Sequence, residues 1–403
     1  MTGIYPAPTQ LERHRQQFPA LANKAYFNFG GQGTLPQASL DAILQAYEYV
    51  QRHGPFSVGV NAWITEEGNQ TRRAIASELS VPAETITLTE DVTVGCNIGL
   101  WGIDWQAGDH MLLTDCEHPG IIATAQEIAR RFKVEVSTCP ILETLNQGDP
   151  TAVIAQHLRP NTRLVVLSHL LWNTGQVLPV ADMVDACRNY SSSAPVRVLV
   201  DAAQSVGCLP LNLTELGADF YAFTGHKWLC GPEGIGGLYV RPDAMESLSP
   251  TFIGWRGITM GQGGKPVGWK PNAQRYEVAT SAYPLYAGLR SAIALHQQWG
   301  TPQERYEQIC QTSEYLWQRL SQLDTIKCLR TAPPQAGLVS FVLTNGGSHK
   351  QLVDSLEAQG FMLRTILDPD CVRACVHYFT SNEEIDRLVE AIKRLVAGRQ
   401  RPE

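Results

Sequence analysis

The chain has 403 residues, of which 44% are hydrophobic and 18% are charged, and its formal net charge is -7. At roughly 100–200 residues per domain, this length predicts about two domains with a large buried core. The 32 basic residues are scattered along the chain, which argues against a nucleic-acid or anionic-membrane partner. No apolar run of about 18 residues occurs, and residues 1–21 lack a basic segment followed by an apolar one, so we expect a cytoplasmic protein.

Short β-branched segments recur in the first part of the chain and alternate with stretches that suit helices. We predict strands at residues 85–89, 110–115, 133–138, 163–170, 196–203, 219–224 and 236–240. This alternation is typical of parallel βαβ units. We therefore expect an α/β fold with a mostly parallel seven-stranded sheet.

The pattern changes after a long predicted helix at residues 280–299. Amphipathic segments with two or three strands then predict a smaller α+β domain. No low-complexity linker separates the two parts, so we expect a helix at the join near residues 285–300. The large domain is predicted at 21–285, and the small domain is predicted to combine 1–20 with 286–403.

Ten cysteines lie far apart, and none has the paired spacing of a zinc site. In a reducing compartment most of them should be small buried hydrophobes. We predict no bound metal.

Two ionisable residues end neighbouring predicted strands. Asp201 closes the apolar segment VLVD, and Lys227 follows DFYAFTGH. Ligands bind at such strand ends, although Asp201 alone could cap a helix and Lys227 alone could be a surface residue. Beside Trp228 the lysine would lose hydration, which lowers its pKa and makes it a nucleophile. The pair suits pyridoxal phosphate: Lys227 would form a Schiff base, and Asp201 would keep the pyridine nitrogen protonated so that the ring acts as an electron sink.

These segments, together with CEHPG, NTGQVLPV and VRACVHYFTSNEEID, resemble the class V aminotransferase, cysteine desulfurase-like family of fold type I pyridoxal phosphate enzymes. The matches run in the family's order from about residue 20 to residue 390. Within the family, SHLLWNTGQVLP and the short segment before VRAC are most similar to the C–S lyases that act on L-cysteine and L-cystine.

The resemblance implies roles for residues around the cofactor. Lys227 would hold the cofactor, Asp201 would pair with its pyridine nitrogen, and Gln204 would hydrogen-bond its 3-oxygen. His118 would stack on the ring and move protons, with a capping or core histidine as the alternative. Thr280 matches a residue that reaches the phosphate of the partner subunit, which implies a homodimer. The phosphate ligands within the chain would be Thr93, the N–H of Val94, Thr224 and His226.

The same resemblance implies a substrate site. Arg373 would grip the α-carboxylate at two points, and Arg364 would lie at the pocket mouth unless it is a surface arginine. Gly30 and Gly31 would let backbone approach the substrate. Two departures stand out. Trp172 replaces an asparagine of the family's desulfurases, so that either the indole or Asn173 would make its contact, and Val92 replaces a threonine, which leaves more phosphate binding to Thr93.

The segment between the two arginines bears on the reaction. A desulfurase needs a thiolate on a mobile loop there, but only the eight residues TILDPDCV separate Arg364 from Arg373. Cys371 is the only thiol among them, and in a strand it would share a face with Arg373 and Cys375. We therefore expect β-elimination, in which Lys227 takes the Cα proton and the products are pyruvate, ammonia and a sulfur species.

Cystine should react better than cysteine because a persulfide leaves more readily than a thiolate. Sulfur released as cysteine persulfide could then supply an acceptor protein, for example for iron–sulfur clusters. Three alternatives stay open: a desulfurase that uses Cys371, an epimerase or transaminase on the same scaffold, and a non-enzymatic phosphate-binding module.

Overall fold

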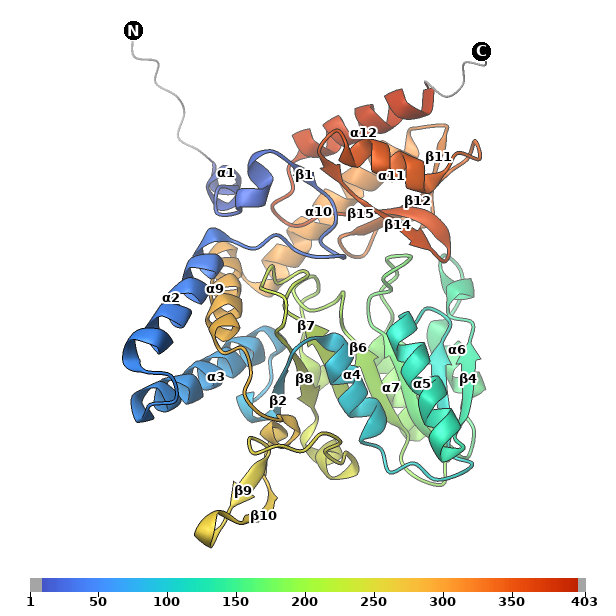
Figure 1. The fold of residues 1–403 in the computed structure, drawn as a ribbon. Coiled ribbons are helices and arrows are strands. Elements are labelled where there is room, and N and C mark those ends of the chain that lie inside the picture. The colour runs from blue at the N-terminus through green and yellow to red at the C-terminus, as the bar shows by residue number, and fades with distance from the viewer. Residues whose placement is uncertain (1–8, 398–403) are drawn as a thin grey trace.

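The computed structural model describes residues 9–397, and it consists of a large domain with a smaller one packed on its upper side (Figure 1). Within these residues, no helix combines the length and the apolar character that a membrane span requires.

The seven predicted strands form one sheet in the large domain, which confirms the predicted fold class. Only β8 runs antiparallel to its neighbours, and the strands from β7 to β4 are parallel. Across the sheet the order is β2 (Ile86–Thr89), β8 (Gly236–Val240), β7 (Phe220–Thr224), β6 (Arg197–Asp201), β5 (Thr162–Ser168), β3 (His110–Thr114) and β4 (Glu135–Cys139).

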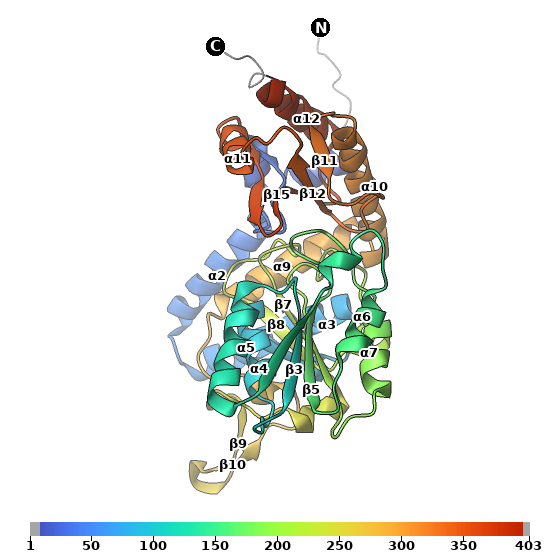
Figure 2. The same cartoon turned by 90° about the vertical axis from the view of Figure 1, so that its right-hand side faces the viewer.

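Helices cover both faces of this sheet (Figure 2). Alternate residues of β5 face opposite cores: Val165 packs with α6 (Pro150–His157) and α7 (Val180–Asn189), whereas Val166 packs with α4 (Val92–Trp101) and α5 (Pro119–Phe132). Because both faces are buried, the central strands read as continuous apolar runs.

The remaining elements of the large domain lie at its edges. Helix α9 (Pro284–Trp299) packs against α2 and α3, and the hairpin of β9 and β10 projects from the far end of the domain (Figure 1). The bounds are α2 (Gln37–His53), α3 (Val58–Leu79), α8 (Leu213–Leu216), β9 (Ile258–Met260) and β10 (Pro266–Trp269).

The small domain has a four-stranded antiparallel sheet, where the sequence predicted two or three strands. The order is β11 (Ile326–Cys328), β12 (Leu338–Leu343), β15 (Asp370–Cys375) and β14 (Arg364–Leu367). Its helices are α10 (Pro302–Ser321), α11 (His349–Glu357) and α12 (Asn382–Ala397). Helix α9 covers almost all of residues 285–300, where we predicted a helix at the join, and it leads into α10 across Gly300 and a Thr301–Glu304 capping box.

The N-terminal segment also packs with the small domain. After α1 (Gln10–Arg15), strand β1 (Ala25–Tyr26) pairs with β13 (Phe361–Met362). Ala25 and Phe27 lie in the apolar core of this domain. We therefore propose that its N-terminal part extends to about residue 28, beyond the boundary at residue 20 that we predicted. The first eight residues of that predicted part lie outside the described residues.

A buried ion pair ties α3 to the edge of the large sheet. The Arg72 guanidinium donates to both Glu277 oxygens at 2.5 and 2.7 Å, and Glu277 also accepts the Leu88 N–H at 3.1 Å. Removing one partner of such a pair leaves an uncompensated buried charge. We expect Glu277→Ala to lower the free energy of unfolding by about 3–5 kcal/mol in denaturant titration.

The matched control is Glu66→Ala. Glu66 pairs with Arg73 on the surface, where the two side chains are 51% and 58% exposed. Exposed pairs of this kind add little to stability, so we expect almost no change. Equal losses in the two variants would contradict the importance of the buried pair.

Candidate active site

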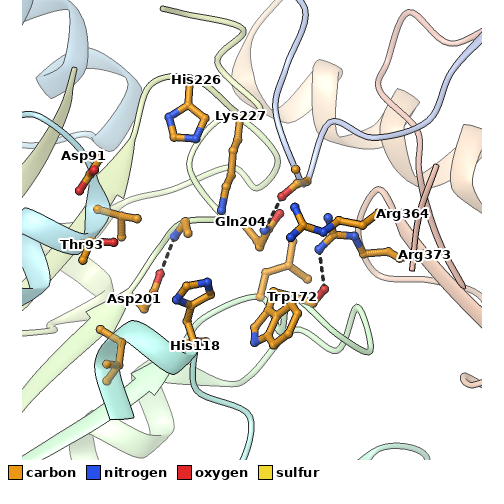
Figure 3. A pocket seen from close by; sticks show the side chains of 17 residues that line it. Asp91, Thr93, His118, Trp172, Asp201, Gln204, His226, Lys227, Arg364 and Arg373 are labelled. Atoms are coloured by element: carbon orange, nitrogen blue, oxygen red, sulfur yellow. Dashed lines mark hydrogen bonds between the residues drawn. The ribbon is translucent and has the colours of Figure 1, made fainter. Parts of the chain in front are cut away.

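The carboxyl ends of β5, β6 and β7 meet the small domain at a cavity of about 260 Å³ (Figure 3). The cavity brings together most of the predicted site residues. It is lined by Gly30, Gly31, Asp91, Val92, Thr93, His118, Ile121, Ser168, Leu170, Trp172, Asp201, Ala203, Gln204, His226, Lys227, Arg364 and Arg373.

Lys227 follows β7 in a tight turn and points its amine into the cavity (Figure 3). Burial lowers the pKa of Lys227 to about 8, even though the charge of Asp201 acts in the opposite direction. Within the part of the chain that the structure describes, the amine donates no hydrogen bond. The side chain therefore lies in a partly desolvated cavity and not on the outer surface.

Asp201 is the last residue of β6 and is buried. Its Oδ1 accepts the Ala203 N–H at 2.9 Å, and turns follow it in place of the helix that a capping aspartate would begin. Burial raises the pKa of Asp201, whereas the charges of Lys227 and His118 lower it. The second carboxylate oxygen can face a cationic ligand group in the cavity.

His118 caps a helix, which was the alternative that the sequence left open, and it also faces the cavity. It is the N-cap of α5, where its Nδ1 accepts the Gly120 N–H at 3.2 Å, and its ring also lines the cavity. Burial lowers the pKa of His118, so the ring is neutral near pH 7. Since Nδ1 accepts, the proton of the neutral ring lies on Nε2.

Gln204 joins three parts of the site. Its Oε1 accepts the Trp228 indole N–H at 2.9 Å, and its Nε2 donates to the Gly30 carbonyl at 2.8 Å. One amide N–H is left for a ligand. A Cβ on Gly30 would lie 2.9 Å from both Cys375 Sγ and Gln204 Oε1, so only glycine fits at this position.

Only some of the predicted phosphate ligands line the cavity. Thr93 and His226 line the cavity, and Thr224 Oγ1 lies 2.6 Å from His226 Nδ1. Val94 does not line it, and its N–H is donated to the Asp91 carboxylate at 2.9 Å, so this group is not available to a phosphate. Asp91 was missed by the sequence reasoning, although aspartate before a helix start is a familiar cap signal. Thr280 is exposed and outside the cavity lining.

Arg373 and Arg364 bring two guanidinium groups to the lining of the cavity. They face each other in register on β15 and β14, and neither forms an ion pair with any described residue. Arg373 is 2% exposed, its Nη1 donates to the Trp172 carbonyl at 2.7 Å, and its Nε has no partner among the described residues. Like charges opposite each other are unfavourable unless an anion separates them. The arrangement therefore suits a carboxylate.

The cavity distinguishes Trp172 from Asn173. Trp172 lines it, donates its indole N–H to the Cys116 carbonyl at 3.0 Å and meets the His118 ring edge to face. Asn173 lies outside the lining and donates its amide to the Asp368 carbonyl at 3.2 Å. The indole, not the amide, faces the cavity.

The two arginines are joined by a closed hairpin. Leu367 pairs with Asp370, so only Asp368 and Pro369 form the turn. Cys371 is fully buried, and burial raises its pKa to about 12. Burial also raises the pKa of Cys375. No thiolate on a mobile loop exists in this hairpin.

These residues fit the predicted cofactor. The cavity offers an amine without a hydrogen-bond partner among the described residues, a buried carboxylate opposite it and a helix start at one end. When bound, pyridoxal phosphate would supply an electron sink there.

Comparisons with known proteins agree with this chemistry. A family model described as aminotransferase class-V matches residues 25–388. A cysteine desulfurase of Haloferax volcanii is 26% identical over 96% of both chains, and one of Yersinia pestis is 29% identical over 96% of this chain and 98% of that one.

Two solved structures of one enzyme are more similar in sequence. C-DES with glycine covalently linked to its PLP cofactor, in a lysine-to-alanine mutant, is 56% identical, with a TM-score of 0.92 over 94% of this chain and 98% of that one. The complex of the cystine C–S lyase C-DES with its reaction product cysteine persulfide is also 56% identical, with a TM-score of 0.92 over 93% and 99%.

The lowered pKa of Lys227 can be measured directly. Only a neutral amine reacts with an acylating reagent, so labelling of Lys227 in the cofactor-free protein should rise with pH and reach half its maximum near pH 8. Mass spectrometry of the labelled peptide gives the titration, and Lys227→Ala provides the blank. A midpoint near the ordinary lysine value of 10.5 would contradict the desolvated site.

Proposed function

The chain belongs to the aminotransferase class V family, and on that premise we propose that it is a pyridoxal phosphate-dependent C–S lyase. Its proposed reaction converts L-cystine and water into pyruvate, ammonia and cysteine persulfide, with L-cysteine as a poorer substrate. The 56% identity to C-DES, a cystine C–S lyase, supports this substrate class. The observation that carries the reaction type is the closed hairpin between Arg364 and Arg373.

The residues of the cavity can bind and deprotonate an α-amino acid. Arg373 would bind the α-carboxylate, and the exposed Arg364 would add positive charge at the mouth. Lys227 Nζ, with a pKa of about 8, would accept the Cα proton. Neutral His118 presents Nε2–H to the same space, and the Trp172 indole limits the access of water. Asp201 would pair with the pyridine nitrogen.

Sulfur leaves without a protein nucleophile in this proposal. A disulfide substrate expels a persulfide, which departs more readily than a thiolate because its conjugate acid is stronger. The alternative, a desulfurase that forms a protein persulfide, is favoured by the names of the curated relatives at 26–29% identity. The burial and raised pKa of Cys371 argue against it.

We also propose that the protein acts as a homodimer. The segment of residues 252–280, which ends at Thr280, exposes large apolar side chains. Phe252 is 68% exposed, Ile253 59% and Trp255 56%. Apolar side chains gathered at one place mark an interface, and a second copy there could bring Thr280 to the partner's cofactor.

All ten cysteines are unpaired, in keeping with a reducing compartment such as the cytoplasm. The persulfide would pass to an acceptor protein.

The two hairpin thiols separate elimination from desulfuration. We expect the Cys371→Ala, Cys375→Ala double variant to release pyruvate from cystine within several-fold of the wild-type rate, because elimination needs only their packing. The cost in stability should be about 1–2 kcal/mol for each buried thiol. A folded Cys371→Ala variant that has lost activity would establish a desulfurase, and racemised substrate without pyruvate would establish an epimerase.

Arg373→Lys tests the carboxylate site. Lysine keeps the charge but loses the two-point geometry, and a misplacement of about 1 Å at the reacting carbon can cost on the order of 100-fold in rate. We expect a loss of that size in kcat/KM for cystine. Arg364→Lys, at the exposed mouth, is the matched control and should lose much less. Equal effects in the two variants would refute the assignment of Arg373.

A further inference from the structure

The turn that carries Lys227 has a hydrogen-bond partner for each of its carbonyl groups. The His226 carbonyl accepts the Gly33 N–H at 2.6 Å, and the Lys227 carbonyl accepts the Cys230 N–H at 3.0 Å. The next two carbonyls, of Trp228 and Leu229, accept from side chains. The backbone of the turn is therefore held by hydrogen bonds, and the two side-chain donors belong to other parts of the chain.

Both side-chain donors are histidines. His377, directly after the small-domain strand β15 and Val376, donates Nε2–H to the Trp228 carbonyl at 3.0 Å. His296, near the end of α9, donates Nε2–H to the Leu229 carbonyl at 2.8 Å. A carbonyl oxygen can only accept, so the proton of each ring lies on Nε2.

The other ring nitrogens are also occupied, and this fixes both tautomers. His377 Nδ1 accepts the Tyr378 N–H at 3.1 Å. His296 Nδ1 accepts from the Tyr378 hydroxyl at 2.7 Å, and that hydroxyl accepts from His14 Nε2 at 2.9 Å. Burial lowers the pKa of His377 to about 3 and that of His14 to about 4, so these rings stay neutral.

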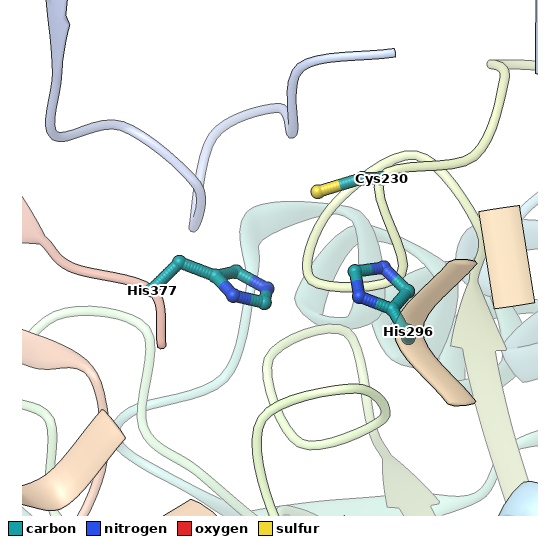
Figure 4. Close-up of side chains that lie close together, drawn as sticks. All are labelled: Cys230, His296 and His377. Carbon is teal, nitrogen blue, oxygen red and sulfur yellow. The ribbon is translucent and has the colours of Figure 1, made fainter. Parts of the chain in front are cut away.

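The same histidines raise the question of a metal ion, because Cys230, His296 and His377 have ligand atoms within 4.8 Å of one another (Figure 4). A metal needs a ring nitrogen with a free lone pair. In both histidines Nε2 carries a proton and Nδ1 accepts a hydrogen bond. The cluster therefore holds backbone and not an ion.

We propose that His377 and His296 are positioning residues for Lys227: they fix the carbonyl groups of Trp228 and Leu229, the two residues that follow it, and so set the depth of its amine in the cavity. This inference rests on the proposed function, because it is the amine's contact with cofactor and substrate that the two histidines serve. The two histidines are 0% and 3% exposed, so losing either donor would leave a buried carbonyl without a partner.

The test compares two amides at position 377. His377→Gln can place its amide near Nε2 and keep the donor to Trp228, whereas His377→Asn reaches only the position of Nδ1 and loses that donor. The control is His110→Asn. His110 is equally buried and hydrogen-bonded through both nitrogens to Thr162 and Ser137, but it lies at the amino end of β3, away from the carboxyl ends that border the cavity.

Two properties are measured on protein reconstituted with pyridoxal phosphate: the pH midpoint of the cofactor's visible absorbance, and kcat for pyruvate release. We expect His377→Asn to shift the midpoint by at least about half a pH unit and to lower kcat on the order of 10–100-fold. His377→Gln and His110→Asn should keep both values. His296→Gln, which also keeps its donor, should behave as the wild type.

The following outcomes would contradict either the inference about the two histidines or the proposed function. If His377→Asn loses stability as His110→Asn does but keeps the midpoint and kcat, the histidines are merely structural and the inference is wrong. Stoichiometric zinc in the purified protein would overturn it as well. If His377→Asn does not fold, His296→Asn, which loses the donor to the Leu229 carbonyl, takes its place. An unchanged midpoint and an unchanged kcat in that folded variant would contradict the inference. A wild-type protein without cofactor absorbance would instead refute the proposed function.

Discussion

The site depends on keeping one amine out of water. Burial lowers the pKa of Lys227 to about 8. Its amine donates no hydrogen bond to a described residue, so its position depends on the backbone that carries it. The turn that carries Lys227 meets this need through Gly33, His377 and His296, which belong to three separate parts of the chain. A Cβ on Gly33 would lie 2.0 Å from the Lys227 carbonyl, so even this packing requires glycine.

The same turn also links the two domains beside the cavity. His377 and Arg373 both come from the end of the small-domain sheet, one held against the backbone beside Lys227 and the other opposite Arg364 without an acidic partner among the described residues. A movement of β15 would therefore change the amine and the carboxylate site together. The uncompensated guanidinium groups also explain why an anionic substrate would stabilise this arrangement.

The sequence predicted the parts of this site that follow from local pattern. Strand alternation located the sheet, and strand ends located Asp201 and Lys227. It could not show that the Val94 N–H is donated to Asp91, because a cap depends on side-chain rotamers. Nor could it locate Gly33, His296 or His377 around the lysine turn, because those contacts join residues far apart in the chain. The sequence predicted only two or three strands for the small sheet because β11 has three residues and β14 has four, which is short for a strand signal.

The central claim is that sulfur leaves by elimination, without a protein thiol. The most direct measurement is to identify the three-carbon product when the protein, loaded with pyridoxal phosphate, turns over L-cystine. Elimination predicts pyruvate in the same amount as cysteine persulfide, with no alanine. Alanine formed together with a persulfide on Cys371 would contradict the account.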